Sequence, residues 1–266
     1  MMDFLLYFLS LAALTLGTLT VCGLAVRLCS HLFSSLLGRG SGAVFDVTSV
    51  IGTPIHELGH AFMCLLFFHP IERIKLWTPN PKNGVYGFVE HRYNRKNLWA
   101  RLGNLPIAFG PIFSGLAVTV LMLYLCFPTL WNDYLVSSQA LIAQGAPAAA
   151  WAGEILSLFL GLPGAIAADP LRGVLGLIVI LPVSLHVSLS WQDIRSALGA
   201  LPIFAVLLLA FAAVTKLLGV SHPILQALKL WNLRLLSLFC VLAAFCLLWV
   251  GVALLVRAVR ALIRCF

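Results

Sequence analysis

Six long apolar runs dominate this sequence of 266 residues and restrict the folds open to it. They lie at about residues 4–26, 44–68, 105–127, 171–189, 200–218 and 235–256. Each is close to the roughly 20 residues that an α-helix needs to cross about 30 Å of hydrocarbon. The runs are continuous rather than alternating, which indicates helices. We therefore expect an all-α polytopic membrane protein with about six transmembrane helices.

The composition agrees with lipid as the solvent of this chain. Hydrophobic residues make up 61% of it and charged residues only 10%, against about 25% charged in a soluble domain. The formal net charge is +8, but the basic residues flank the apolar runs. That placement favours orientation in a membrane and excludes nucleic acid as the expected partner. The seven cysteines lie mostly within the runs, which predicts packing rather than disulfides.

The runs are expected to form a single membrane domain over residues 1–266. Its core would lie at about 44–199, with accessory spans at 4–26, 200–218 and 235–256. No segment resembles a soluble sensing module. We therefore expect control to come from trimming of the substrate or from a regulatory membrane subunit.

The two long connections differ in charge. Residues 69–104 are rich in Lys and Arg, whereas residues 128–170 carry acidic residues and no Lys or Arg. The positive-inside rule places the first connection in the cytoplasm and the second outside. The sequence thus predicts a multi-pass protein of the bacterial cytoplasmic membrane.

The basic connection also has strand character. Residues 71–77 and 85–91 are rich in β-branched and aromatic side chains, and residues 78–84 between them have strong turn composition. This pattern predicts a β-hairpin at the cytoplasmic face between the second and third spans.

The most informative motif is His56-Glu57-Leu58-Gly59-His60. The histidines are four residues apart, so on a helix they share one face and converge on one metal ion. Glu57 is placed to take a proton from a water whose pKa a zinc ion lowers to about 7. Thr53 and Pro54 favour a helix start just before the motif.

A catalytic zinc needs a third protein ligand. Asp193 is the main candidate, although Ser190-Trp-Gln-Asp193 also fits a helix-capping box, and the two roles do not exclude each other. His186 lies seven residues earlier on nearly the same helical face. Asp169 and Glu154 lie in the outer connection, far from the histidines in this topology.

Three further residues are expected to play no part in binding the metal. His69 and His91 belong to the basic connection and are expected to be solvated. Cys64 is expected to pack in the core.

These residues together resemble the site-2 protease family of intramembrane zinc metalloproteases over about residues 56–193. The resemblance rests on the transmembrane motif, the glycine-containing hairpin, a Gly-Pro in Phe109-Gly-Pro-Ile-Phe-Ser-Gly115, and a later aspartate. This chain has Ser114 where the family usually has asparagine. It has Gln192-Asp193-Ile194 in place of Leu-Asp-Gly.

The resemblance implies roles for several residues. It makes Asp193 the third zinc ligand and lets His186 take the place of a substrate-holding asparagine. His186 could instead compete as a ligand or make a plain polar contact in the core. It also implies that the hairpin offers an edge strand to an unwound substrate, for which Val85 to Val89 is the candidate, with Gly84 and Gly87 allowing close approach. The alternative is a hairpin that only packs over the site as a lid.

The expected function is that of a zinc metalloendopeptidase in regulated intramembrane proteolysis. Its cofactor would be Zn²⁺, and it would cut transmembrane or membrane-proximal segments of membrane proteins or peptides within the lipid bilayer. Three alternatives remain. One is a non-catalytic zinc-binding scaffold, one a CAAX-type metalloprotease with Glu154 as ligand, and one a metal transporter, which would need more ionisable groups in the spans after Asp193.

Overall fold

The computed structural model describes residues 2–79, 81 and 84–264, and most of these residues are helical. In chain order the elements are α1 (Met2–Ala12), α2 (Thr18–Leu37), α3 (Gly40–Leu66), β1 (Ile71–Lys75), β2 (Phe88–His91), α4 (Leu98–Cys126), α5 (Pro128–Gln144), α6 (Ala148–Ala168), α7 (Pro170–His186), α8 (Trp191–Leu198), α9 (Leu201–Leu217) and α10 (Ser221–Arg264). A π-helical turn, Ala13–Gly17, joins α1 to α2. The fold is that of a helical membrane protein with one small sheet, as predicted.

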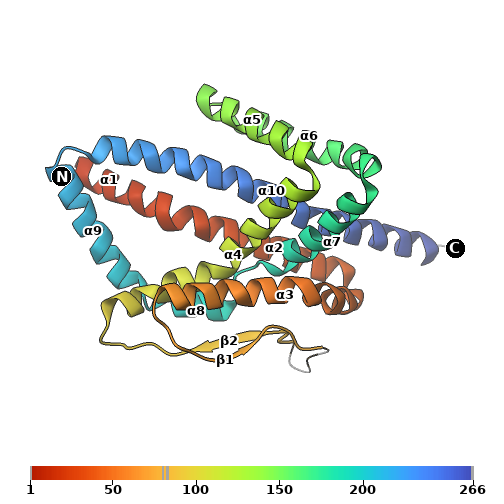
Figure 1. Ribbon diagram of the computed structural model, residues 1–266, viewed down its shortest axis with the longest axis horizontal. Coiled ribbons are helices and arrows are strands. Elements are labelled where there is room, and N and C mark those ends of the chain that lie inside the picture. Colours follow the sequence, from red (N-terminus) through yellow and green to blue (C-terminus); the bar gives the residue numbers. More distant parts are fainter. Residues whose placement is uncertain (1, 80, 82–83, 265–266) are drawn as a thin grey trace.

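The helices that lie at two opposite edges of the molecule are connected by helices that cross between these edges (Figure 1). The hairpin and α3 lie on one side, and α5 and α6 lie on the other. Helices α4 and α7 run between these sides, and both contact α3. Helix α10 extends along α2, and α9 packs against α1. Two of the helices that contact α3 are therefore the one that carries the Gly-Pro motif and the one that leads to Asp193.

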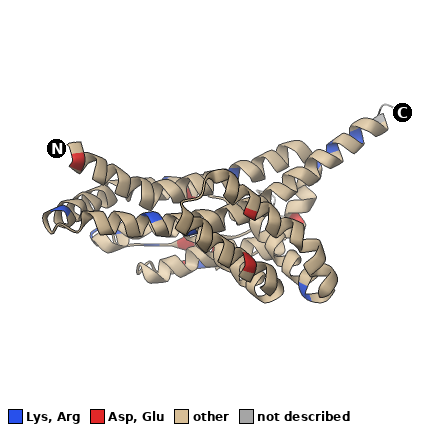
Figure 2. Ribbon diagram, turned by 90° about the horizontal axis from the view of Figure 1, so that it is seen from above, with Lys and Arg blue, Asp and Glu red and all other residues tan. Residues whose placement is uncertain are grey.

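Four described helical segments are long and apolar enough to cross a membrane, and the bent pair α7–α8 would make a fifth. The four are Met2–Leu37, Leu98–Cys126, Ala148–Ala168 and Ser221–Ile263. Large apolar side chains on their surfaces, such as Val21 and Leu160, are exposed, as lipid-facing positions are. Figure 2 shows how sparse charged residues are along the helices.

The predicted count of six spans is not confirmed. Helix α3 falls outside the four because His56, Glu57 and His60 lower its mean hydropathy, and α9 is short. The acidic connection, residues 128–170, is not a loop but the helical pair α5–α6. Pro128 begins α5, and Gly145 ends it with a positive φ of 59°, which an L side chain rarely adopts. Helix α6 is itself one of the four segments.

Two local predictions on the site side also need correction. Helix α3 begins at Gly40 rather than at Thr53, so Pro54 lies inside it and leaves the carbonyl of Val50 without its helical N–H donor. The hairpin is confirmed as antiparallel, with Ile71 opposite His91 and Lys75 opposite Phe88. Strand β2 begins only at Phe88, however, so residues 85–87 lie outside the ladder.

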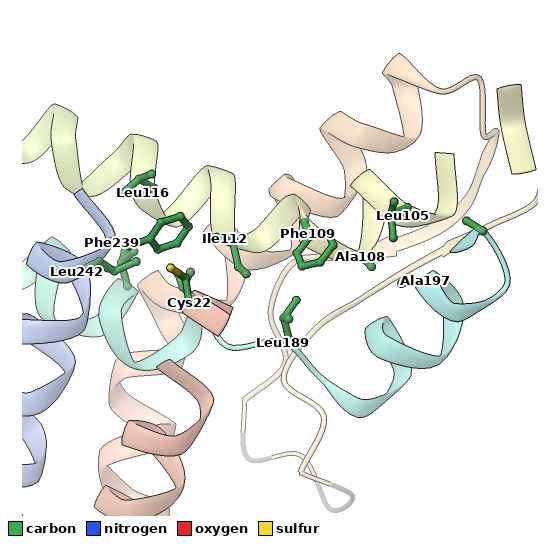
Figure 3. Packing of buried hydrophobic residues seen from close by; sticks show 13 residues of the cluster. Cys22, Leu105, Ala108, Phe109, Ile112, Leu116, Leu189, Ala197, Phe239 and Leu242 are labelled. Carbon is green, nitrogen blue, oxygen red and sulfur yellow. The ribbon is translucent and has the colours of Figure 1, made fainter. Parts of the chain in front are cut away.

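The largest buried cluster lies where α4 meets α7, α8, α2 and α10. Phe109, Ile112 and Leu116 of α4 face Leu189 and Cys22 across this core (Figure 3). Helices gain little from the hydrophobic effect in lipid, so close packing of such side chains supplies much of their attraction. This core holds α4 and the segment after α7 in fixed positions beside α3.

Candidate metal site

His56 and His60 lie one turn apart on α3, with ring centroids separated by 5.0 Å. Nδ1 of His60 donates to the carbonyl of Ile107 at 2.8 Å, and Nδ1 of His56 donates to the carbonyl of His186 at 2.9 Å. A carbonyl oxygen only accepts, so each Nδ1 carries the ring proton. Each Nε2 therefore keeps its lone pair for a metal ion, the arrangement that orients metal-binding histidines in proteins.

Asp193 reaches the histidines because the span that carries it is broken. Helix α7 ends at His186, α8 begins at Trp191, and the two are bent by 58°. Oδ1 of Asp193 lies 3.3 Å from Nε2 of His60. Its Oδ2 accepts from the N–H of Ser190 at 2.8 Å, while the Ser190 hydroxyl accepts from the N–H of Asp193 at 3.0 Å. The predicted capping box is confirmed, and the carboxylate still turns one oxygen to the histidines.

The donors of His56, His60 and Asp193 fit one metal ion. One ligand atom from each lies within 4.8 Å of the other two. Nitrogen and oxygen ligands at about 2.0–2.1 Å from a tetrahedral ion lie roughly 3.3 Å apart. The separation of His60 Nε2 from Asp193 Oδ1 is 3.3 Å. An ion held by these three side chains would keep a fourth coordination position open.

The break between α7 and α8 also exposes main-chain carbonyls that find partners in other helices. The carbonyl of His186 accepts from His56, as above. That of Leu185 accepts from the Ser30 hydroxyl at 3.0 Å, and that of Leu189 accepts from the Arg27 guanidinium at 2.5 Å. Non-helical backbone inside a membrane is tolerated where its polar groups are satisfied in this way. Helix α2 thus supports the break that delivers Asp193.

Close packing of α3 on α4 aligns the motif with the Gly-Pro segment. A Cβ added at Gly59 would lie 2.5 Å from the carbonyl oxygen of Gly110, and one at Gly110 would lie 2.5 Å from that of Gly59. The Ser114 hydroxyl donates to the carbonyl of Ile55 at 2.8 Å. Two glycines face to face therefore allow the backbone contact that brings the carbonyl of Ile107 to His60.

Glu57 is buried beside the metal-binding group. Its side chain lines a cavity of about 280 Å³ together with His56, His60 and Asp193. A second cavity, of about 210 Å³, is also lined by His56 and Glu57. Because Glu57 lines both cavities, a molecule in either cavity would lie next to it.

Residues 84–87 before β2 lie over the Glu57 side of the site. A Cβ at Gly87 would lie 2.7 Å from Cγ2 of Thr53 and 2.8 Å from Cγ of Glu57, so this glycine lets the chain before β2 pack closely on α3. Gly84 has a positive φ of 71°, which fits the turn, and a Cβ there would have no atom within 4 Å. Val85 lines both cavities.

Two polar bonds hold the hairpin on α3. Nε1 of Trp77 donates to the Ser49 hydroxyl at 2.9 Å, and the Tyr86 hydroxyl donates to Oδ1 of Asp46 at 2.6 Å. Burial and the neighbouring carboxylate of Asp46 raise the pKa of Tyr86 to about 12. The two bonds fix the chain on both sides of the turn.

The other candidate ligands take different places. The ring of His186 bonds through Nε2 to the Thr48 hydroxyl at 2.9 Å and lines the second cavity. Asp169 caps α7 by accepting from the N–H of Arg172, and Glu154 lies on α6. Among the described residues, none of these belongs to the metal-binding group.

His69 and His91 are not the solvated residues that the sequence suggested. His69 is 1% exposed and its Nδ1 lies 2.9 Å from Nδ1 of His91, which itself lines the larger cavity. The signal that could have found them is the hairpin. In an antiparallel hairpin the first residue of the first strand lies opposite the last residue of the second. Residue 91 therefore lies beside residue 71, close to the end of α3.

Comparison with known proteins adds no relative. No protein-family model, curated protein or solved structure matches this chain.

Proposed function

We propose that this chain is an intramembrane zinc metalloprotease of the site-2 protease type. The observation that carries the proposal is the convergence of His56, His60 and Asp193 within 4.8 Å, beside a cavity that Glu57 also lines. Two imidazoles and one carboxylate are a donor set that catalytic zinc sites use. The membrane-embedded helices around the group support hydrolysis within the bilayer.

The chemistry divides between the ion and the protein. Zinc bound here would supply a Lewis acid that polarises the scissile carbonyl and lowers the pKa of a water to about 7. Glu57 accepts the proton of that water as it attacks, and returns it to the leaving amine as the peptide bond breaks. The main-chain carbonyls of Ile107 and His186 hold the two imidazoles in the tautomer that binds metal.

The hairpin is the proposed substrate platform. A helical substrate has to unwind before its peptide bond is open to attack, and an extended strand satisfies the freed backbone groups. Val85 and Gly87, together with Phe88, Val89 and His91 of β2, line the same cavity as His56, His60 and Asp193. The cut would thus fall in an extended segment lying beside β2.

The proposed location is the bacterial cytoplasmic membrane, with the site toward the cytoplasm. The basic residues of the 69–104 connection, which contains the hairpin, support this orientation through the positive-inside rule. Substrates would be membrane proteins or membrane-inserted peptides, and control would come from their prior trimming or from a regulatory membrane subunit.

The experiment measures zinc content and cleavage on the purified full-length chain in phospholipid vesicles. Single-span membrane proteins with a cytoplasmic epitope tag serve as reporters. We expect one zinc per chain, loss of cleavage on chelation, and recovery on adding zinc. A zinc-bound chain that cuts none of a broad set of reporters would favour a non-catalytic scaffold.

The chain offers a matched control for the third ligand. Asp193 and Asp169 both cap a helix, but only Asp193 belongs to the metal-binding group. Asp193→Ala should therefore lose zinc and cleavage, whereas Asp169→Ala should keep both. Equal zinc binding by the two variants would contradict the ligand assignment.

A further inference from the structure

Among the polar groups of the cavity, His91 is one that the proposed mechanism does not use. It stands on β2 and lines the same cavity as Glu57 and Asp193. Its ring is bonded to His69, which is buried at the end of α3. The hydrogen bonds of this pair determine which nitrogen of His91 carries the proton.

His69 comes first in the proton assignment. Its Nε2 lies 2.7 Å from the carbonyl oxygen of Ala100. Because that oxygen only accepts, Nε2 carries a proton. Burial lowers the pKa of His69, so the ring is neutral and its Nδ1 is an acceptor. Tyr93 stacks on the ring at a centroid distance of 5.0 Å and holds its plane.

The assignment then passes to His91. The two Nδ1 atoms are 2.9 Å apart, and since that of His69 accepts, that of His91 donates. Burial and the neighbouring His69 and His60 lower the pKa of His91 to about 4, so this ring is also neutral. Its second nitrogen, Nε2, therefore carries no proton and is an acceptor.

A hydrogen-bond acceptor on the β2 side of the cavity could bind the main chain of a substrate. A peptide extended beside β2 has main-chain N–H groups that lost their helical partners when the substrate unwound. Glu57 is committed to proton transfer and Asp193 to the metal and the capping box. The Nε2 of His91 is an acceptor of the same cavity that neither of these roles uses, and it stands on the strand beside which the peptide would lie.

We propose that Nε2 of His91 accepts a hydrogen bond from one main-chain N–H of the substrate, and that His69 is a positioning residue that holds His91 in the required tautomer. The proposal deepens the proposed function and rests on it. It also predicts a sequence preference. A proline or an N-methylated residue at that one substrate position has no proton to give and should be a poor substrate.

The tautomer is tested without any activity. Nitrogen NMR of the ¹⁵N-histidine-labelled full chain should show His91 protonated at Nδ1 and bare at Nε2. His69→Phe, which keeps a ring under Tyr93 but removes the acceptor, should abolish that preference. Tyr93→Phe keeps the stack and should leave it unchanged. A His91 ring protonated at Nε2 in the wild-type protein would overturn the proposal.

The substrate contact is tested with peptides spanning the cut of a reporter that the wild-type chain cleaves. His91→Phe should lower kcat/KM by about 2- to 10-fold, the range for one neutral hydrogen bond, mainly through KM. His91→Gln restores an acceptor near the Nε2 position and should recover most of the loss. N-methylation at one position should cost the wild type a similar factor and His91→Phe almost nothing further.

The outcomes separate this inference from the function beneath it. If the wild-type chain cuts the peptides and His91→Phe cuts them equally well, the contact is wrong and the protease assignment stands. If the wild-type chain cuts none of the reporters, the proposed function fails and the substrate contact with it. The NMR result still decides the tautomer in either case.

Discussion

Replacing Gly59 by alanine tests whether the contact between α3 and α4 sets the geometry of the metal site. The added Cβ would lie 2.5 Å from the carbonyl oxygen of Gly110 and 2.6 Å from its carbon. These are main-chain atoms of a helix, so they cannot rotate away as a side chain can. Ordinary contact begins at 3.4 Å, so the helices must separate by about 0.9 Å.

That separation has two consequences. Overpacking of this kind costs about 1–3 kcal/mol of stability. The bond from His60 to the carbonyl of Ile107, now 2.8 Å, bridges the same two helices and would lengthen toward roughly 3.7 Å, beyond hydrogen-bonding range. Loss of such a support for a metal ligand lowers metal affinity by about 10- to 100-fold.

The assays are thermal unfolding of the chain in detergent and zinc affinity by competition with a chelator. Gly42→Ala is the matched control, because Gly42 lies on the same helix and a Cβ there meets nothing within 4 Å. It should be neutral or stabilising by up to about 1 kcal/mol. Gly59→Ala with the stability and zinc affinity of Gly42→Ala would refute the reasoning.

Three further predictions concern the surroundings of the site. Ser190→Ala removes the capping hydroxyl but keeps the Asp193 carboxylate, so the free energy of unfolding should fall by about 1 kcal/mol while zinc is retained. Asp193→Ala should lower the free energy of unfolding and also lose zinc. Equal loss of zinc by the two variants would argue against separate roles for the two side chains. Gly87→Ala should slow cleavage and leave zinc content unchanged, because its Cβ would meet the Glu57 side chain at 2.8 Å; unchanged cleavage rates would contradict this. Burial lowers the pKa of His69 below 6.5 and lowers that of His91 from 6.5 to about 4. The hairpin packed on α3 therefore binds fewer protons than a detached one, and its packing should weaken as the pH falls from about 6.5 toward 4. Hydrogen exchange at β2, corrected for intrinsic rates, should rise over that range and would stay flat if the two histidines were not buried.

The sequence predicted the parts of the site that depend on side-chain spacing. The motif placed His56 and His60 on one helical face, and the hairpin was visible from β-branched and aromatic residues around a turn. The capping box at Ser190 was also readable, and it coexists with the ligand position of Asp193. Each of these follows from local periodicity or turn chemistry, which a single sequence contains.

Other parts depend on long-range contacts that spacing does not reveal. The carbonyls of Ile107 and His186 orient the rings of His60 and His56. Every residue has a main-chain carbonyl, so the residue types give no sign of which carbonyl will be used. The ring of His186 bonds to Thr48, and spacing alone did not separate this polar contact in the core from the other roles considered for it. The helical pair α5–α6 was missed for a different reason, since its apolar residues were taken for a connection although Ala148–Ala168 is long enough to span.

The most direct test of the central claim is the Glu57→Gln variant, measured for zinc content and for cleavage in the same vesicle preparation. Glutamine keeps the size of the side chain and removes the base, and Glu57 is not in the group of His56, His60 and Asp193 that could hold the ion. We predict one zinc per chain, as in the wild type, with cleavage lost. A Glu57→Gln chain that still cuts the reporter would contradict the assignment of Glu57 as the base and, with it, the proposed mechanism.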